Sequence, residues 1–120
     1  SFIENELVER AEKLGKKLYT WLDGWKNEFP ERIPLILGNG MVWAVFICNP
    51  GTKELDADFT DRLVEKVMQK GVYSIRTGCG TVKLGPPLTI SEIALKEAIG
   101  VYVETMSQMI DVDYKTSIPV

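Results

Sequence analysis

The sequence predicts an α+β domain in which a small antiparallel or mixed sheet carries helices on one side. Its 120 residues form a chain long enough for one core, and a domain of this size buries about two-thirds of the surface that its unfolded chain exposes. Hydrophobic residues make up 45% and charged residues 26%, which is typical of a globular protein. Helical and extended hydrophobic patterns then alternate along the chain in the order α-β-α-β-β-α.

The first expected element is an amphipathic helix that reaches almost to Pro30. Glutamates are concentrated in its early turns and lysines follow later, which is the order that the helix dipole favours. The apolar side chains recur at steps of three and four residues, at Leu7, Ala11, Leu14, Leu18, Leu22 and Trp25.

Residues 35–48 are expected to form one extended segment, with Gly38-Asn39-Gly40 as a flexible or bulged point. The run from Met41 to Ile47 has no polar break. Such a run is typical of a strand that is buried on both faces, or of one that reserves a face for a partner.

A second helix follows, with Asp58 or Thr60 as its N-cap and Gly71 at its end. Residues 72–75 and 81–84 are expected to pair as a hairpin around Thr77–Gly80. A third helix follows a capping box made by Thr89 and Glu92, and residues 111–120 are expected to be a frayed polar tail.

Composition excludes several kinds of function. A net charge of −3 without a basic block disfavours nucleic acid as a partner. No apolar run is long enough to cross a membrane. The absence of histidine excludes histidine-based catalysis and histidine-ligated metal, and no metal site is expected.

The two cysteines, Cys48 and Cys79, are far apart in the sequence. Free thiols in a cytoplasmic protein are favoured over a disulfide. A small enzyme that uses Cys79 as a nucleophile ranks last, because no histidine is available to activate the thiol.

Local patterns give few other candidates for chemistry. The acidic residues between Glu54 and Asp61 lack the glycine and distal glutamate of a calcium loop, so helix capping explains them better. In the segment Val82–Ile90, Lys83 points to the opposite face from its two apolar neighbours, and Pro86-Pro87 stiffens the chain between a strand and a helix. Lys83 is therefore either a contact for an anionic ligand or a solvated lysine on an edge strand.

At this segment the sequence resembles the C-terminal small domain of class III aminotransferases, the pyridoxal-phosphate enzymes that include ornithine, acetylornithine and 4-aminobutyrate aminotransferases. Lys83–Ile90 and the helix after it resemble the family's Pro-Pro-Leu-x-Ile segment and final helix. Upstream, Asn5–Ala11 looks like the opening helix of the small domain. Gly38–Trp43 looks like its glycine-containing strand, usually written RGxGLMWG, and Lys70–Val72 matches the approach to its second strand.

Four positions depart from the family pattern. Lys83 stands where the family often has the arginine that meets a substrate carboxylate, and lysine lacks the bidentate fork of arginine. Leu37 and Ala44 replace the arginine and glycine at the two ends of the glycine motif. Phe46 takes the place of an acidic residue that often follows.

The resemblance implies that the chain is part of a pyridoxal-phosphate-dependent aminotransferase, which transfers an amino group between an amine or amino acid and a 2-oxo acid. No segment resembles the family's Schiff-base lysine, the acidic partner of the cofactor ring or the phosphate-binding loop. The chain alone is therefore expected to hold no cofactor and to be inactive, with no catalytic residue of its own. Lys83 is the implied substrate contact, and Gly85, Pro86 and Pro87 support it.

The resemblance also implies two partners, a large domain of the same enzyme and a second subunit in a homodimer. The strand over residues 41–47 and a face formed by Trp21 and Trp25 are the expected contacts with the large domain. An alternative is a free-standing, non-catalytic binding or regulatory module with the same fold. The start at Ser1, almost directly in a helix, favours a piece of a larger protein over such a module.

Overall fold

The computed structural model describes residues 2–72, 75–76, 80–87 and 89–118, which form an α+β fold as expected. The elements, in chain order, are α1 (Phe2–Glu28), β1 (Leu35–Asn39), β2 (Val42–Phe46), α2 (Ala57–Gln69), β3 (Ile75–Arg76), β4 (Thr81–Leu84) and α3 (Glu92–Ser117). The order is therefore α-β-β-α-β-β-α, and the expected order was wrong by one strand. Of the predicted turn over Thr77–Gly80, the structure describes only Gly80. The other three residues, with Cys79 among them, lie outside the described residues.

The extra strand arises because residues 35–46 form a hairpin instead of one extended segment. β1 and β2 are antiparallel, and Asn39 pairs with Val42, so that Gly40 and Met41 make a two-residue turn. Gly40 has φ 59°, a left-handed conformation that glycine adopts without strain and that suits the first position of a type II′ turn. The sequence did not reveal this turn because both arms of the hairpin are largely apolar.

A close approach between α1 and the hairpin turn explains why residue 15 is a glycine. A Cβ atom on Gly15 would lie 2.5 Å from the carbonyl oxygen of Gly40, closer than such atoms come in proteins. Gly15 therefore lets the helix backbone lie directly against the turn, and it helps to place the hairpin on α1.

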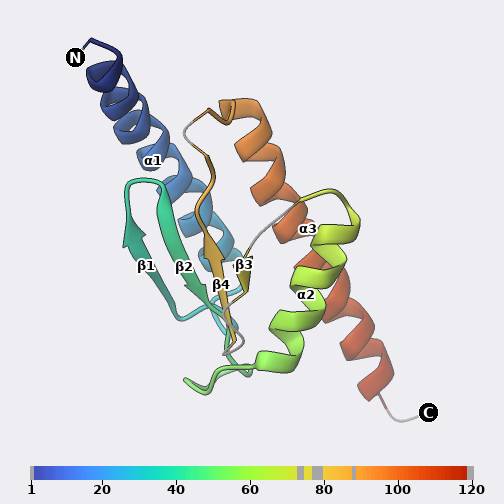
Figure 1. Cartoon of the computed structure of the whole chain (residues 1–120). Helices are drawn as coiled ribbons and strands as arrows, with labels where there is room; N and C mark the ends of the chain where they lie inside the picture. Colours follow the sequence, from blue (N-terminus) through green and yellow to red (C-terminus); the bar gives the residue numbers. More distant parts are fainter. Residues whose placement is uncertain (1, 73–74, 77–79, 88, 119–120) are drawn as a thin grey trace.

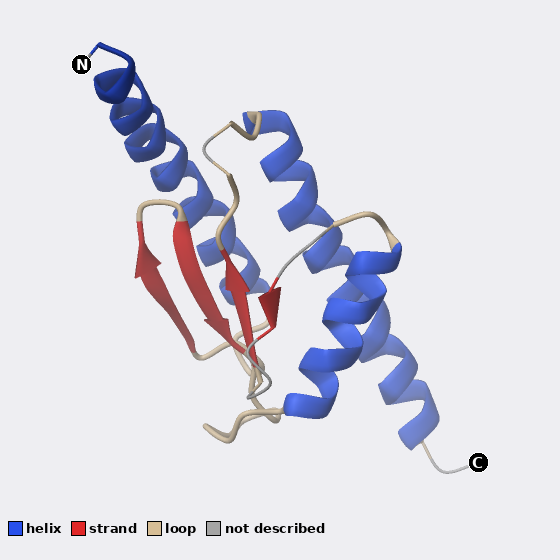
Figure 2. Ribbon diagram, in the orientation of Figure 1, coloured by secondary structure: helices blue, strands red, loops and turns tan. Residues whose placement is uncertain are grey.

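The four strands form one antiparallel sheet in the order β1-β2-β4-β3 (Figures 1 and 2). α1 runs behind this sheet, while α2 lies beyond its β3 edge and packs on α3. Side chains on one sheet face point into the core, as the full burial of Val45 and Val82 shows. The resulting core combines the sheet with all three helices.

Trp25 lies inside this core, not on a surface for a partner. It is 1% exposed, its ring lies 5.2 Å from that of Tyr102, and its indole N–H donates to the sulfur of Met106 at 3.3 Å. The predicted Trp21/Trp25 contact face was therefore wrong for Trp25, because the helix turns this residue towards α3. Trp21 is half-buried against the same core.

The helix ends differ from the predicted ones by a few residues. Asp56 caps α2, with its carboxylate accepting from the Phe59 amide at 3.0 Å, so neither Asp58 nor Thr60 does so. Ser91 caps α3 through the Ala94 amide at 3.1 Å, in place of the predicted Thr89. Residues 111–117 continue α3, although a frayed tail was expected there.

Candidate functional site

Lys83 lies in the middle of β4, between two strands of the sheet. It pairs with Ala44 on β2 and with Ile75 on β3. Its side chain is exposed, while those of Val82 and Leu84 are buried. The predicted alternation of side chains along this strand is confirmed, but the strand is not at the edge of the sheet.

The register of the strands places Lys83 on the sheet face that points away from the core, here called the open face. Its apolar members are partly or largely exposed, with Leu37 at 52% and Val42 at 53%. The described side chains of the open face are Leu35, Leu37, Asn39, Val42, Ala44, Phe46, Thr81 and Lys83. A cation thus stands on a mainly apolar surface, which is a suitable arrangement for an anionic group carried by an apolar partner.

The segment after β4 is held by its own backbone and by α3. Gly85, Pro86 and Pro87 follow the last strand residue, and the Ile90 amide donates to the Pro87 carbonyl at 3.0 Å. Two consecutive prolines fix φ and donate no backbone hydrogen bond, so the segment has few alternative conformations. Beside it lies a mainly apolar hollow with a volume of ≈ 640 Å³, bordered by Leu84 of β4, Gly85–Pro87 and α3.

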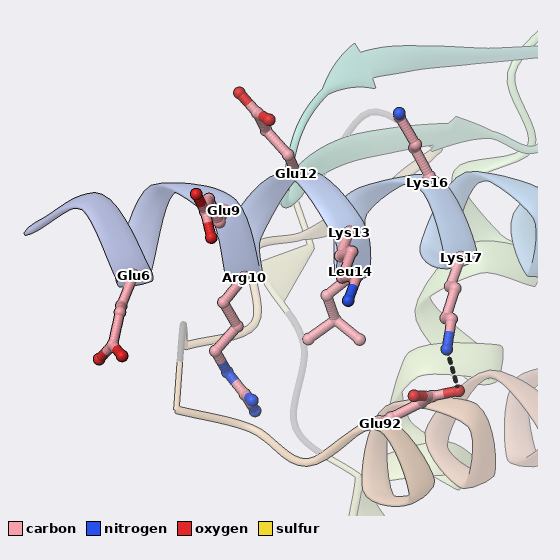
Figure 3. A pocket seen from close by; sticks show the side chains of 9 residues that line it. All are labelled: Glu6, Glu9, Arg10, Glu12, Lys13, Leu14, Lys16, Lys17 and Glu92. Carbon is pink, nitrogen blue, oxygen red and sulfur yellow. Dashed lines mark hydrogen bonds and ion pairs between the residues drawn. The ribbon is translucent and has the colours of Figure 1, made fainter. Parts of the chain in front are cut away.

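Two contacts from α1 tie down the far end of this segment. The Arg10 guanidinium donates to the Ile90 carbonyl at 2.5 Å, and the Lys17 ammonium pairs with the Glu92 carboxylate at 2.6 Å. Figure 3 shows Arg10 and Lys17 projecting from the same side of α1, with Lys17 directed at Glu92. Because Lys17 and Glu92 are about half exposed, the pair contributes little to stability but fixes where α3 starts relative to α1.

The charged groove in Figure 3 is the surface between these two helices. Four acidic and four basic side chains line it, so their charges largely compensate one another. The groove therefore does not select a ligand of one charge.

The acidic residues before α2 serve the fold, as the capping prediction proposed. Besides capping α2, Asp56 accepts from the Arg32 guanidinium at 2.8 Å, and the Arg32 carbon Cζ lies 4.0 Å above the Phe59 ring. Both partners of the pair are largely buried. Within the described part of the chain, no group of three or more acidic or cysteine side chains could hold a metal ion.

Cys48 is a free and buried thiol at the end of the β2 segment. Burial raises the pKa of this thiol above its usual range, and the negative charge of Asp56 raises the pKa further. The thiol therefore stays protonated and unreactive at neutral pH. Cys79 lies outside the described residues, so the cysteine-enzyme alternative gains nothing from the structure.

The described residues do not fit pyridoxal phosphate. That cofactor needs a lysine in an enclosed site, an acid beside its ring nitrogen and a phosphate anchor. No lysine of the described chain is buried, and the hollow beside Pro86-Pro87 is lined mainly by apolar side chains. The described residues therefore do not form an enclosed site for this cofactor by themselves.

Sequence reasoning found Lys83 but missed the side chains that surround it. Val42 and Phe46 belong to a run that was expected to be buried on both faces or to keep one face for a partner, and the hairpin places both on the open face with Lys83. Side chains alternate between the two faces of any strand, but residues 42–46 are all apolar, so the sequence does not show which of them share the face of Lys83.

The described helices include none that is long and apolar enough to cross a membrane.

Comparison of the sequence with those of known proteins shows that the chain is similar to aminotransferases. The chain is 34% identical to mitochondrial ornithine aminotransferase from Oryza sativa subsp. japonica over 92 residues, and 32% identical to 4-aminobutyrate aminotransferase from Mycobacterium bovis over 97 residues. These alignments cover 77% and 79% of the chain but only 19% and 21% of the relatives. The chain thus spans about a fifth of the length of the curated relatives it matches.

Solved structures give the same result. A lysine aminotransferase from M. tuberculosis matches 88% of the chain with a TM-score of 0.76 and 27% identity, over 22% of its own length. No family model matches the chain. The resemblance to aminotransferases is confirmed at the level of the family, while placement in the C-terminal small domain stays a prediction.

Proposed function

We propose that the chain is the C-terminal small domain of a class III, pyridoxal-phosphate-dependent aminotransferase, which moves an amino group between an amine or amino acid and a 2-oxo acid. One observation carries the proposal. Lys83, the residue that the resemblance implies for the substrate, is exposed on the open face directly before the Pro86-Pro87 segment. Aminotransferase relatives and structural neighbours support the assignment.

Lys83 is the group that contacts the acidic end of the substrate. Its ammonium attracts a carboxylate as a point charge, without the two parallel hydrogen bonds of a guanidinium. Gly85, Pro86 and Pro87 restrict the strand end that carries it, and the contacts of Arg10 and Lys17 hold the next helix in place. The domain therefore orients the substrate and leaves the chemical step to the rest of the enzyme.

The rest of the enzyme is the principal partner. Its large domain holds pyridoxal phosphate, which supplies the electron sink for the reaction, and packs over part of the open face. The hairpin side of that face, around Leu37 and Val42, is the apolar surface available for this contact. The complete enzyme acts as a homodimer in the cytoplasm, and the chain alone has no transaminase activity.

The test is an assay of the complete protein with pyridoxal phosphate, an amino donor and a 2-oxo acid. Lys83→Ala is expected to raise the KM for the acidic substrate at least tenfold, because the substrate carboxylate then lies in the site without a cation to pair with. Lys96→Ala, at an exposed position of α3, serves as the matched control and keeps the parental KM. A complete protein without aminotransferase activity contradicts the proposed function, and an unchanged KM in Lys83→Ala removes Lys83 from the site.

A further inference from the structure

Two hollows lie along one face of α3 and share a residue. The first is the mainly apolar hollow of ≈ 640 Å³ beside Pro86-Pro87, and the second, of ≈ 390 Å³, lies between α2 and the later turns of α3. Lys70, the C-cap residue of α2, lines both. Residues of α3 that line them recur at steps of three and four and therefore share one helix face, namely Ala94, Ala98, Val101, Thr105, Gln108 and Val112. The two hollows together are here called the α3 groove.

The half of the α3 groove near the start of α3 is apolar because small residues leave space above the core. A Cβ atom on Gly85 would meet nothing within 4 Å, and Ala98 extends only a methyl group from the helix. Val72, Ile90 and Val101 also line this half, and they are partly buried against the core. An apolar group placed here covers these side chains and removes their surface from water, which favours binding.

The other half of the α3 groove carries positive charge that the described residues do not neutralise. The Lys70 ammonium donates to the Thr105 hydroxyl oxygen at 2.9 Å and to the Gln108 side-chain oxygen at 3.1 Å, and both acceptors are neutral. Lys66 lines the same half one helical turn earlier, and its ammonium pairs with no carboxylate in the part of the chain that the structure describes. Two ammonium groups are therefore available to an anion where the apolar half ends.

The acidic residues near the α3 groove set the direction of a ligand. Asp113, at the far end, is paired with Arg62 at 3.3 Å, and the Glu104 carboxylate accepts from the Gln108 amide group at 3.3 Å. Glu97 lines the apolar half, about 12–16 Å along the helix axis before the two residues that Lys70 contacts. Its negative charge disfavours an anionic group at that end, so the anionic end of a ligand lies at Lys70.

We propose that the α3 groove is a binding site for a phosphate monoester carried on an apolar body. The phosphate bears nearly two negative charges at neutral pH and matches the two ammonium groups of Lys66 and Lys70. The apolar body lies in the hollow between Ala98 and the Pro86-Pro87 segment. This inference goes beyond the proposed function and does not depend on it, because Lys83 does not line the α3 groove.

The test uses the 120-residue chain, labelled with ¹⁵N, and follows its amide signals during titration at constant pH and ionic strength. The probes are octyl phosphate as dispersed monomers, octan-1-ol as the apolar body alone and inorganic phosphate as the head alone. Octyl phosphate is expected to shift signals of residues 66–72 and 94–108. It should bind about tenfold or more tightly than inorganic phosphate, since each buried methylene strengthens binding by up to about fourfold. It should also bind about tenfold more tightly than octan-1-ol, because two ammonium groups pair with its head.

Variants identify the side chains responsible. Lys70→Met and Lys66→Met are each expected to weaken octyl phosphate binding at least about threefold and to leave octan-1-ol binding unchanged. Lys96→Met is the matched control, because it removes an exposed lysine of α3 that does not line the groove. Ala98→Phe fills the apolar half and is expected to weaken octyl phosphate binding about tenfold. Thermal unfolding followed by circular dichroism verifies each fold, and Ala94→Phe, at an exposed position on the same wall, replaces Ala98→Phe if that variant does not fold.

A second arm separates a single bound molecule from a membrane surface. Vesicles of phosphatidylcholine with phosphatidic acid present the same phosphate monoester on a bilayer, and co-sedimentation measures binding to them. Binding of monomeric octyl phosphate supports the inference, whereas binding to vesicles without binding of the monomer overturns it. Equal binding of octyl phosphate and octan-1-ol, equal binding by wild type and Lys70→Met, or no binding of octyl phosphate also overturns it. None of these results affects the assay of the complete protein with pyridoxal phosphate, which tests the proposed function separately.

Discussion

Gly15 and Gly24 occupy the same helix but meet different surroundings. A Cβ atom on Gly15 would collide with the backbone of Gly40, whereas a Cβ atom on Gly24 would have no neighbour within 4 Å. Gly15→Ala is expected to lower the free energy of unfolding by about 1–3 kcal/mol, because α1 and the hairpin turn have to separate. Gly24→Ala is expected to raise it by about 1 kcal/mol through helix propensity.

Urea unfolding of the two variants and the wild type measures both effects. Both variants replace glycine by alanine within α1, so the gain in helix propensity is the same for each. The difference between their free energies of unfolding therefore measures the contact of residue 15 with the hairpin turn. Equal changes in the two variants would mean that the contact between Gly15 and Gly40 does not restrain the helix.

The raised pKa of the Cys48 thiol leads to a prediction about the stability of the protein at alkaline pH. Its pKa is raised in the folded protein, first by burial and then by Asp56, so the folded state holds the thiol proton more tightly than the unfolded state. Stability is therefore lost as the pH rises above the ordinary thiol pKa of about 8.5, by at most about 1.4 kcal/mol per pH unit. Below that pH the thiol has no such effect.

The measurement compares the free energy of unfolding at pH 7.5 and pH 10 in the wild type and in Cys48→Ala, with a reductant present. The wild type should lose more stability between these two conditions than the variant does. If both proteins lose the same amount, Cys48 is not the group responsible, and other groups that titrate in this range explain the loss.

At the scale of the elements, the caps of α2 and α3 are expected to differ in strength. Ser91 only caps its helix, whereas Asp56 also pairs with the largely buried Arg32. Ser91→Ala should cost about 1 kcal/mol. Asp56→Ala should cost about 2–4 kcal/mol, because it leaves the Arg32 charge without its partner.

Asp56→Asn separates the two roles of Asp56. The amide oxygen still accepts from the Phe59 backbone, but the negative charge is gone. Its cost, measured by denaturant unfolding, should fall between those of Ser91→Ala and Asp56→Ala. An Asp56→Ala variant no less stable than Ser91→Ala would show that the pair with Arg32 contributes nothing.

The elements also show how much of the fold can be predicted from the sequence alone. The three helices were predictable because apolar residues recur at helical spacing and turn residues bound them. The hairpin was not, because residues 41–47 are all apolar and carry no alternation by which to assign faces. Thr89 and Ser91 are both residue types that cap helices, and the structure uses Ser91, whose hydroxyl accepts from the Ala94 amide.

The candidate site was predictable in part for the same reason. Val82 and Leu84 flank Lys83 with apolar side chains, so its orientation followed from alternation within one strand. Its neighbours Val42 and Phe46 come from another strand, and their proximity depends on the pairing of β2 with β4. Such long-range register cannot be derived from spacing within either segment.

At the scale of the whole molecule, the open face is expected to drive self-association of the isolated chain. Leu35, Leu37 and Val42 expose apolar surface side by side on the hairpin. Leu37→Asp should shift the chain towards the monomer in sedimentation velocity at concentrations where the wild type associates. Ile93→Asp is the control, because Ile93 is 71% exposed at the start of α3, away from this face.

If the wild type remains a monomer at millimolar concentration, the exposed hairpin is not sufficient for association. If Ile93→Asp disperses the chain as well as Leu37→Asp does, association depends on general apolar exposure and not on the open face.

The pairing of Ala44 with Lys83 also limits which changes of length the chain tolerates. One residue inserted or deleted in β4 before Lys83 would exchange the two faces of the strand, so that the lysine pointed into the core and an apolar neighbour took its place outside. The exposed loop over residues 50–54 has no such constraint. Natural and engineered variants of this domain should therefore vary in length in that loop and keep the distance from Gly80 to Pro86 constant.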